Sequence, residues 1–175
     1  MDTIVETRAK PGKYLTFALG PEEFGLEILK VREIIGYMDI TAIPQTPEHV
    51  RGVVNLRGQV IPVVDLRKRF GLPPTEATKS TRIVVVEASG MTVGLVVDSV
   101  DEVRNLPTDT IEPPSPIVTT VDSDFLMGVG KLPAGGGQEQ LVILLDLDRV
   151  TSVAERQALS ALGAGGETTA LPSGG

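Results

Sequence analysis

Residues 128–132, Gly-Val-Gly-Lys-Leu, are the part of the chain that comes nearest to a nucleotide-binding loop. A phosphate-binding loop needs an earlier glycine at a fixed spacing and a serine or threonine after its lysine, because backbone amides and a hydroxyl hold the phosphates and their magnesium ion. Phe125 and Leu132 occupy these two positions here. The flanking apolar runs also predict a strand on each side, whereas the loop requires a helix after it. We therefore expect no nucleotide cofactor.

Metal binding and nucleophilic catalysis have equally little support. The chain contains no cysteine, and its single histidine, His49, cannot build a multi-histidine metal site. The pairs Asp122 with Asp124 and Asp146 with Asp148 lack the glycine and the regularly spaced oxygen ligands of a calcium loop. The Gly-x-Ser-x-Gly motif of many hydrolases is also missing. We expect no catalytic residue, no metal, no cofactor and no enzyme activity.

Charge is unevenly distributed along the chain. The formal net charge of -7 argues against a nucleic-acid-binding protein, which is usually basic. Residues 51–71, RGVVNLRGQVIPVVDLRKRFG, nevertheless carry five basic side chains and one acidic one. The N-terminus has no apolar leader, and no run reaches the roughly 18 apolar residues needed to cross a bilayer. We therefore expect a cytoplasmic protein without membrane insertion, whose basic segment serves either the fold or a partner protein.

Alternating and β-branched apolar runs predict an all-β fold. Leu15, Phe17 and Leu19 alternate with other residues as in a half-buried strand. Similar runs occur at 24–28, 50–56, 59–65, 81–88, 91–98, 125–132 and 140–146. Polar ends predict a flexible N-terminus over residues 1–13 and a flexible tail over residues 163–175. A short C-terminal helix is expected over residues 151–162, before Gly163.

Two parts of the chain are similar to each other. Residues 24–34, FGLEILKVREI, align with residues 93–103, VGLVVDSVDEV, with four identities in eleven positions. Further matches follow in the same order, including VVDL at 63–66 with LLDL at 144–147. The repeat predicts two packed five-stranded β-barrels, from residues 14–75 and 76–150. Closure of a sheet removes its exposed edges, and units of this size bury too little surface to stand alone.

Comparison of the two copies singles out Arg57. The segment NLRG at 55–58 aligns with KLP at 131–133, so the leucine recurs and the arginine does not. Arg57 is therefore the best candidate for a functional residue rather than an architectural one. Two other interpretations stay open: a solvated charge in a turn, or an ion pair with Glu33 that shapes a groove. Such a partly exposed pair would contribute roughly 0–1 kcal/mol by itself.

The segment VRGVVNLRGQVIPVVDLRKRFG, with FGLEILKVREI before it and VGLVVDSVDEV after it, resembles the CheW family of bacterial chemotaxis coupling proteins. The likeness runs in order from Tyr14 to about Val153. It implies two packed SH3-like barrels and a non-enzymatic adaptor that joins chemoreceptor tips to the regulatory domain of the histidine kinase CheA. It also implies recruitment to membrane-associated receptor arrays, and we expect a monomer when free. A regulatory double-barrel module of another histidine-kinase system is the alternative.

The resemblance also implies roles for particular residues. An apolar groove between the barrels would receive the helical receptor tip. The expected receptor-binding residues are Ile28, Val31, Glu33, Gly52, Arg57, Val100 and Val103. Ile117, in the segment PPSPIVTTV, is expected on a kinase-binding surface. Core packing is the alternative for the apolar groove residues, a backbone requirement is the alternative for Gly52, and a packed loop is the alternative for Ile117.

Overall fold

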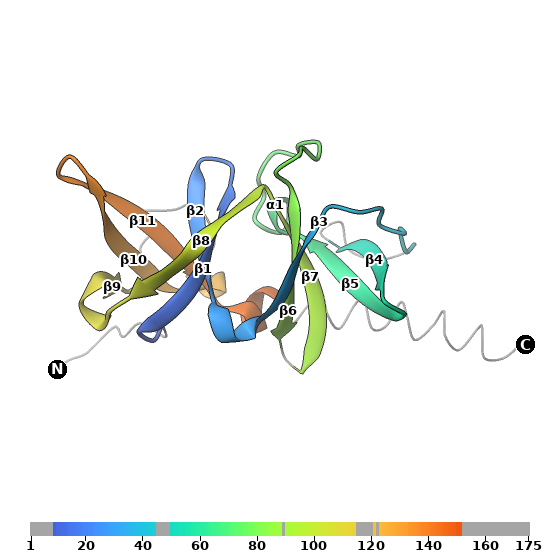
Figure 1. The fold of residues 1–175 in the computed structure, drawn as a ribbon, viewed down its shortest axis with the longest axis horizontal. Helices are drawn as coiled ribbons and strands as arrows, with labels where there is room; N and C mark the ends of the chain where they lie inside the picture. The colour runs from blue at the N-terminus through green and yellow to red at the C-terminus, as the bar shows by residue number, and fades with distance from the viewer. Residues whose placement is uncertain (1–8, 45–49, 89, 115–120, 122, 152–175) are drawn as a thin grey trace, which may run out of the picture.

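Strands make up almost all of the regular structure in the computed structural model, which describes residues 9–44, 50–88, 90–114, 121 and 123–151 (Figure 1). The strands are β1 Gly12–Leu19, β2 Glu22–Glu27, β3 Val31–Gly36, β4 Val50–Leu56, β5 Gln59–Asp65, β6 Arg82–Ala88, β7 Met91–Val97, β8 Ser99–Leu106, β9 Ile111–Glu112, β10 Leu126–Gly135 and β11 Gln138–Leu145. The helical elements are η1 Ile28–Lys30, α1 Leu66–Arg69, η2 Thr108–Thr110, η3 Ser123–Phe125 and residues 147–151. The expected all-β class is confirmed.

The strands form two sheets that do not follow the two halves of the chain. One has six strands in the order β8-β1-β2-β11-β10-β9, and the other has five in the order β3-β6-β7-β5-β4. Each copy of the repeat therefore gives its first hairpin, β1–β2 or β6–β7, to the sheet of the other copy. The expected boundary at residue 75 is wrong for the sheets, because the five-stranded sheet takes its strands from residues 31–97.

The exchanged hairpins join their sheets through equivalent strand pairs. β2 runs parallel to β11, with Gly25 opposite Leu144, and β7 runs parallel to β5, with Gly94 opposite Val63. A Cβ atom at Gly25 would lie 3.0 Å from a methyl carbon of Leu144, and one at Gly94 would lie 2.9 Å from a methyl carbon of Ile83. The glycine that both copies carry at this position therefore leaves room for the side chains packed around it.

The five-stranded sheet curls until its two end strands approach each other. Beyond β3, Thr41 forms a bridge with Val53 of β4 through two backbone hydrogen bonds of 2.9 Å. In the β4–β5 turn, Arg57 forms an ion pair with Glu33 of β3. The curl encloses a small cluster of buried side chains from β4, β5 and β6: Val54, Ile61, Val63, Ile83 and Val85. Such curvature is what a barrel requires.

The two sheets share one large core. Leu26 of the six-stranded sheet lies in the same buried cluster as Val84 and Leu95 of the five-stranded sheet. Leu66 of α1 and Val150 near the C-terminal end of the described chain belong to it as well. Because each unit is small, this common cluster supplies burial that neither sheet would have alone.

Strand β1 is buried on both of its faces. Leu15 and Phe17 point into the shared core, while Tyr14 belongs to a second cluster within the six-stranded sheet. Between them, the Thr16 hydroxyl donates a hydrogen bond of 2.8 Å to the Glu102 carbonyl and accepts one of 3.2 Å from the Glu102 amide. The expected half-buried strand is therefore wrong, because the face that alternation predicted to be open is covered by the second cluster, in which Tyr14 lies with Leu106, Met127 and Leu144.

All four phenylalanines of the chain form one row through the core. The ring centroids of Phe17 and Phe24 are 5.8 Å apart, those of Phe24 and Phe70 are 5.8 Å apart, and those of Phe70 and Phe125 are 5.7 Å apart. These separations lie in the range of favourable aromatic pairs. The row connects β1 and β2 with α1 and η3, so it joins parts of both repeat copies.

Both ends of the described chain differ from expectation. Ala9 is buried, its amide donates a hydrogen bond to the Met127 carbonyl, and β1 begins at Gly12, so the expected flexible segment 1–13 is too long. The C-terminal helix begins at residue 147 instead of 151, with the amide of Arg149 donating to the Asp146 carboxylate. The rest of the expected helix and the expected tail over residues 163–175 lie outside the described residues.

Candidate functional site

Two short connections carry the chain from one sheet to the other, and four of the expected receptor-binding residues lie in or beside them. η1 leads from β2 to β3, and Asp98 leads from β7 to β8. β3 and β8 are each the end strand of their sheet. Ile28 lies in η1, Val31 is the first residue of β3, and Val100 and Val103 lie on β8. Figure 1 shows two lobes, one built around each sheet, and these positions lie at the boundary between them.

The apolar candidates at this boundary are only partly buried. Ile28, Val31 and Val100 pack against the shared core and remain partly exposed. Val103 lies opposite Leu15 in the β1–β8 pair and is 47% exposed. Core packing therefore accounts for part of the side chains of Ile28, Val31 and Val100, and the exposed part of all four side chains is accessible to a partner.

Leu29, which sequence reasoning did not select, is the most exposed of the large apolar residues in the described chain. Its side chain lies on η1 and is 97% exposed. In the repeat alignment its position is occupied by Asp98 in the second copy. An apolar residue at a position where the other copy carries a charge was the available signal that Leu29 does not belong to the core.

The Glu33–Arg57 ion pair joins β3 to the β4–β5 turn. The Arg57 side chain is 70% exposed and that of Glu33 is 33% exposed. Arg57 and Gly58 have φ angles of 53° and 86°, which fits a two-residue hairpin turn that usually contains asparagine and glycine. The hydrogen bond from Arg57 to Glu33 raises the pKa of the guanidinium. Of the interpretations of Arg57 given above, the geometry supports the ion pair with Glu33. The pair holds the Arg57 guanidinium at an exposed turn.

Gly52 of β4 packs against the backbone of Thr41 and Ala42, in the segment that follows β3. Its φ angle is 142°, and a Cβ atom there would lie 2.0 Å from the Thr41 carbonyl oxygen and 2.9 Å from the Ala42 Cα atom. These separations are far below van der Waals contact, so only glycine fits. A backbone requirement therefore explains Gly52 without any contact with a partner.

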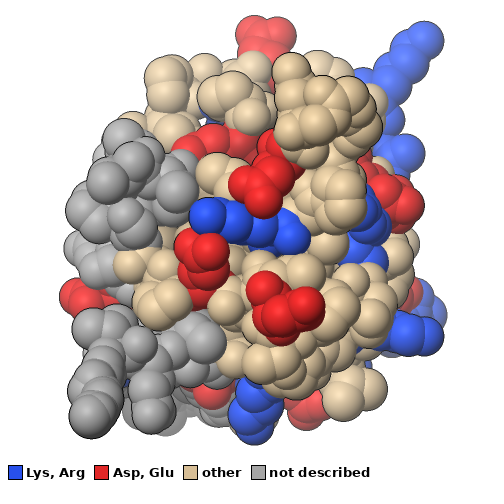
Figure 2. Space-filling model, turned by 90° about the vertical axis from the view of Figure 1, so that its left-hand side faces the viewer, with Lys and Arg blue, Asp and Glu red and all other residues tan. Residues whose placement is uncertain are grey.

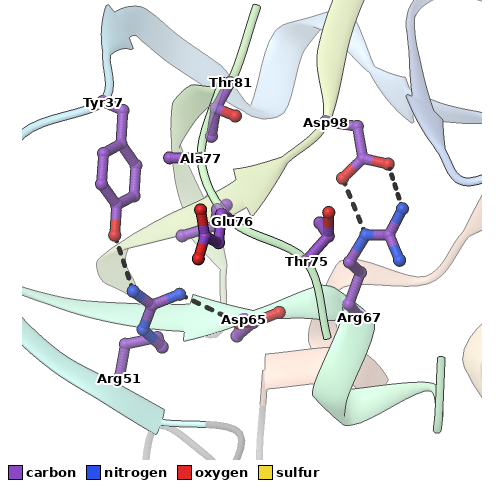
Figure 3. Close-up of a pocket in the computed structure, with 10 residues that line it drawn as sticks. Tyr37, Arg51, Asp65, Arg67, Thr75, Glu76, Ala77, Thr81 and Asp98 are labelled. Carbon is purple, nitrogen blue, oxygen red and sulfur yellow. Dashed lines mark hydrogen bonds and ion pairs between the residues drawn. The ribbon is translucent and has the colours of Figure 1, made fainter. Parts of the chain in front are cut away.

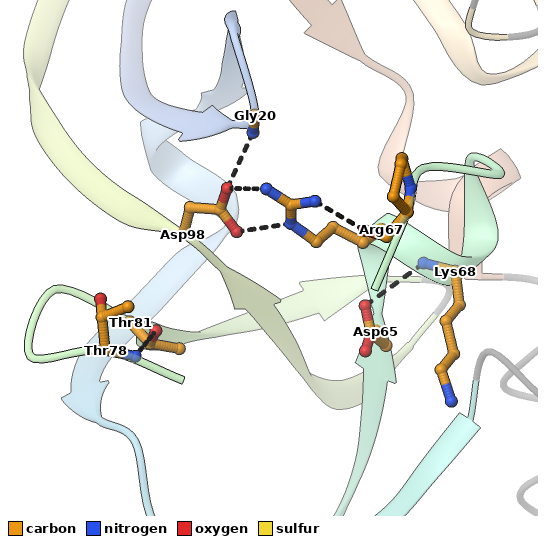
Figure 4. A network of polar contacts seen from close by, with 8 residues as sticks. Gly20, Asp65, Arg67, Lys68, Thr78, Thr81 and Asp98 are labelled. Atoms are coloured by element: carbon orange, nitrogen blue, oxygen red, sulfur yellow. Dashed lines mark hydrogen bonds and ion pairs between the residues drawn. The ribbon is translucent and has the colours of Figure 1, made fainter. Parts of the chain in front are cut away.

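A clasp formed by Arg67 and Asp98 holds the second connection in place (Figure 4). Arg67 donates two hydrogen bonds to the carboxylate, from Nε to Oδ1 at 2.9 Å and from Nη2 to Oδ2 at 2.6 Å. The amide of Gly20, in the β1–β2 turn, donates to the same carboxylate at 2.7 Å. The hydrogen bonds from Arg67 hold the pKa of Asp98 below its ordinary value. The clasp thus links α1, the β1–β2 turn and the start of β8.

The other arginines of segment 51–71 also contact the fold. Arg51 forms an ion pair of 3.0 Å with Asp65. Arg69 lies 4.5 Å from the centroid of the Phe125 ring and donates a hydrogen bond to the Val150 carbonyl. Burial lowers the pKa of the Arg69 guanidinium. Arg51 and Arg69 therefore contribute to the fold through contacts within the chain. Arg57 is the arginine of this segment whose exposure leaves it most accessible to a partner protein.

Charges on the face of the six-stranded lobe are mixed in sign. In Figure 2, basic and acidic side chains lie next to one another, without a continuous basic area. Two ion pairs of this lobe, Lys131 with Glu112 and Arg104 with Glu102, likewise place a basic side chain next to an acidic one. This face therefore lacks the basic surface typical of nucleic-acid binding.

Other expected features can be placed only in part. Ile117 lies outside the described residues. Within the described residues there is no group of acidic or histidine side chains that could hold a metal ion. None of the helices in the described part of the chain is long and apolar enough to cross a membrane.

The family of the chain follows from comparison with known proteins. A family model for the CheW-like domain matches residues 13–155. The chain belongs to the CheW-like family. The expected family resemblance is thereby confirmed, and membership places the chain among chemotaxis scaffold proteins.

Individual members of the CheW-like family are similar to most of the chain. The chemotaxis protein CheW of Klebsiella aerogenes is 37% identical over 143 residues, which cover 82% of this chain and 83% of the relative. The chemotaxis protein CheW of Rhizobium meliloti is 34% identical over 82% of this chain and 90% of its own length. The crystal structure of the scaffolding protein TtCheW from Thermoanaerobacter tengcongensis has a TM-score of 0.75 and 40% identity, and covers 85% of this chain and 97% of that protein.

Proposed function

We propose that this protein is a non-enzymatic adaptor that couples the signalling tips of chemoreceptors to the regulatory domain of a CheA-type histidine kinase. It acts in the cytoplasm as a monomer when free and is recruited to membrane-associated receptor arrays. Membership of the CheW-like family supports this proposal. The observation that carries it is an accessible apolar surface at the boundary between the sheets, which gives a helical partner a place to pack.

The receptor tip binds at the boundary surface made by Ile28, Leu29, Val31, Val100 and Val103. A helix that docks on a protein needs an apolar contact area with charges at its rim. Leu29 is almost fully exposed, and Val103 is about half exposed, so both offer area that the core does not use. The exposed Arg57, held by Glu33, supplies a rim charge on the five-stranded lobe.

The kinase domain binds a different surface, to which Ile117 contributes. Gly52 supports the site indirectly, because it permits the close approach of the segment at Thr41 to β4.

Calorimetric titration tests the two interactions separately. The protein is titrated with the regulatory domain of the CheA-type kinase from the same organism, and then with a dimeric receptor-tip fragment in the presence of that domain. The substitution Leu29→Glu should weaken receptor binding at least about tenfold, or roughly 1.4 kcal/mol, because it places a charge in the apolar contact. Kinase binding should not change.

Gln138→Glu is the matched control, because it adds the same charge at an exposed position of the β10–β11 hairpin. It should leave both affinities unchanged. Equal receptor binding by Leu29→Glu and the unsubstituted protein would remove the boundary surface from the proposal. Absence of binding to both partners at high micromolar concentration would overturn the adaptor function itself.

A further inference from the structure

A cavity of about 300 Å³ opens in the five-stranded lobe beside the Arg67–Asp98 clasp (Figure 3). Its walls come from the ends of β4, β5 and β7, from the residue after β3, from α1, from the residue between β7 and β8, and from segment 72–81, which leads from α1 to β6. The volume lies at the lower end of the range of about 300–1,000 Å³ that is typical of small-molecule sites.

Both arginines that line the cavity already have anionic partners. Arg51 donates from Nη1 to Asp65 at 3.0 Å and from Nη2 to the Tyr37 hydroxyl at 2.6 Å. Arg67 is held by both carboxylate oxygens of Asp98. The two guanidinium charges are therefore compensated within the wall, and neither is left to attract an anionic ligand.

Glu76 is the charged residue of the cavity that has no partner in the described part of the chain. No hydrogen bond or ion pair joins it to any residue that the structure describes, and Figure 3 shows its carboxylate among the labelled side chains around the cavity. The lining contains three carboxylates, from Asp65, Glu76 and Asp98, and two guanidinium groups, from Arg51 and Arg67. The excess of one negative charge favours a cationic ligand.

Hydrogen-bond donors are also available on the walls. The Tyr37 hydroxyl accepts a hydrogen bond from Arg51, so its own hydrogen can be donated to a ligand. The Thr75 hydroxyl lies on the same segment as Glu76 and has no partner among the described residues. The cavity thus offers an anionic acceptor together with neutral donors, and Val96 and Ala77 supply apolar area.

We propose that this cavity binds a small organic cation, an amine or guanidinium that also carries a hydrogen-bond acceptor, of the size of a free basic amino acid. The cationic group pairs with Glu76, and the acceptor receives a hydrogen bond from Tyr37. The site is independent of the adaptor function proposed above, because it uses neither the boundary residues nor Arg57.

Tyrosine fluorescence provides a direct test with L-arginine as the probe. The chain has two tyrosines and no tryptophan, and Tyr14 is buried, so a ligand in the cavity should change mainly the emission of Tyr37. L-Arginine should give a saturable change at constant ionic strength. Agmatine, which lacks the carboxylate, should bind more weakly, and glutarate, which has no cationic group, should not bind.

Two variants assign the interactions. Glu76→Gln should weaken L-arginine binding at least tenfold, whereas Glu139→Gln, which removes the same charge from an exposed position of β11, should not. Tyr37→Phe, followed by the amide NMR signals of Thr75 and Ala77, should weaken L-arginine binding and leave agmatine binding unchanged. The lack of a saturable response to L-arginine, equal binding by Glu76→Gln, or tighter binding of glutarate would each overturn the proposal.

Discussion

Replacement of Gly52 by alanine offers the sharpest test of how the five-stranded sheet is held closed. An added Cβ atom would lie 2.0 Å from the Thr41 carbonyl oxygen, which accepts a hydrogen bond from Val53. The φ angle of 142° adds backbone strain of about 1–3 kcal/mol for a residue other than glycine. Displacement of Thr41 would also break two backbone hydrogen bonds, each contributing about 0.5–1.5 kcal/mol.

The sum predicts that Gly52→Ala lowers the free energy of unfolding by roughly 2–6 kcal/mol, equivalent to a fall in Tm of roughly 4–24 °C for a chain of this size. Urea unfolding followed by far-UV circular dichroism measures the first quantity, and calorimetry measures the second. Gly36→Ala is the control, because a Cβ atom at Gly36 would meet nothing within 4 Å. If Gly52→Ala stayed within about 0.5 kcal/mol of the unsubstituted protein, the close approach of Thr41 to β4 would be refuted.

Two further variants test charged groups through pH. Asp98→Asn should destabilise the protein at neutral pH by roughly 1.5–3 kcal/mol, the usual contribution of hydrogen bonds to charged groups. Because Arg67 lowers the pKa of Asp98, this stability is present above the ordinary pKa and is lost as pH falls through the folded value, so the difference between the two proteins in urea unfolding should shrink as pH falls below the ordinary pKa of Asp98. Burial, together with the hydrogen bond and charge of Asp101, raises the pKa of Glu23 to about 8. The stability due to the protonated form is complete below the ordinary carboxyl pKa of 4.5 and is lost as pH rises through the folded value. Glu23→Gln should therefore stabilise the protein more at about pH 8 than at about pH 5, by about 1 kcal/mol after allowance for solvent screening, and a pH-independent difference would contradict the raised pKa.

Hydrophobic pattern and the repeat predicted the strands well, because both are local properties of the chain. The similarity of FGLEILKVREI to VGLVVDSVDEV identified two copies of one unit. It could not show that each copy gives its first hairpin to the other. Gly25 and Gly94 would suit a close strand pair whether each hairpin joined the sheet of its own copy or that of the other copy. The sequence therefore does not distinguish pairing within a copy from pairing between copies.

The candidate site was predictable only in part, because its polar partners are distant in sequence. Arg57 was selected because the second copy lacks it, and Glu33 was named as its possible partner. Nothing in the sequence around Arg67 indicated that Asp98 is its partner, because two strands, β6 and β7, lie between these residues along the chain. Leu29 was missed because an apolar residue within an apolar run is expected to be buried.

The exchange of hairpins has a consequence for biosynthesis. β1 and β2 leave the ribosome first, yet their pairing partners outside the hairpin are β8 and β11, and β11 ends at Leu145. The five-stranded sheet, complete by Val97, can assemble while the rest of the chain is still being made. The N-terminal hairpin must then stay unpaired at its β1 edge until β8 has been made, and at its β2 edge until β11 has been made. A nascent chain of which about the first 100 residues have left the ribosome would therefore contain one finished sheet and a hairpin with exposed edges, which is the stage at which contact with chaperones or with a second nascent chain is easiest.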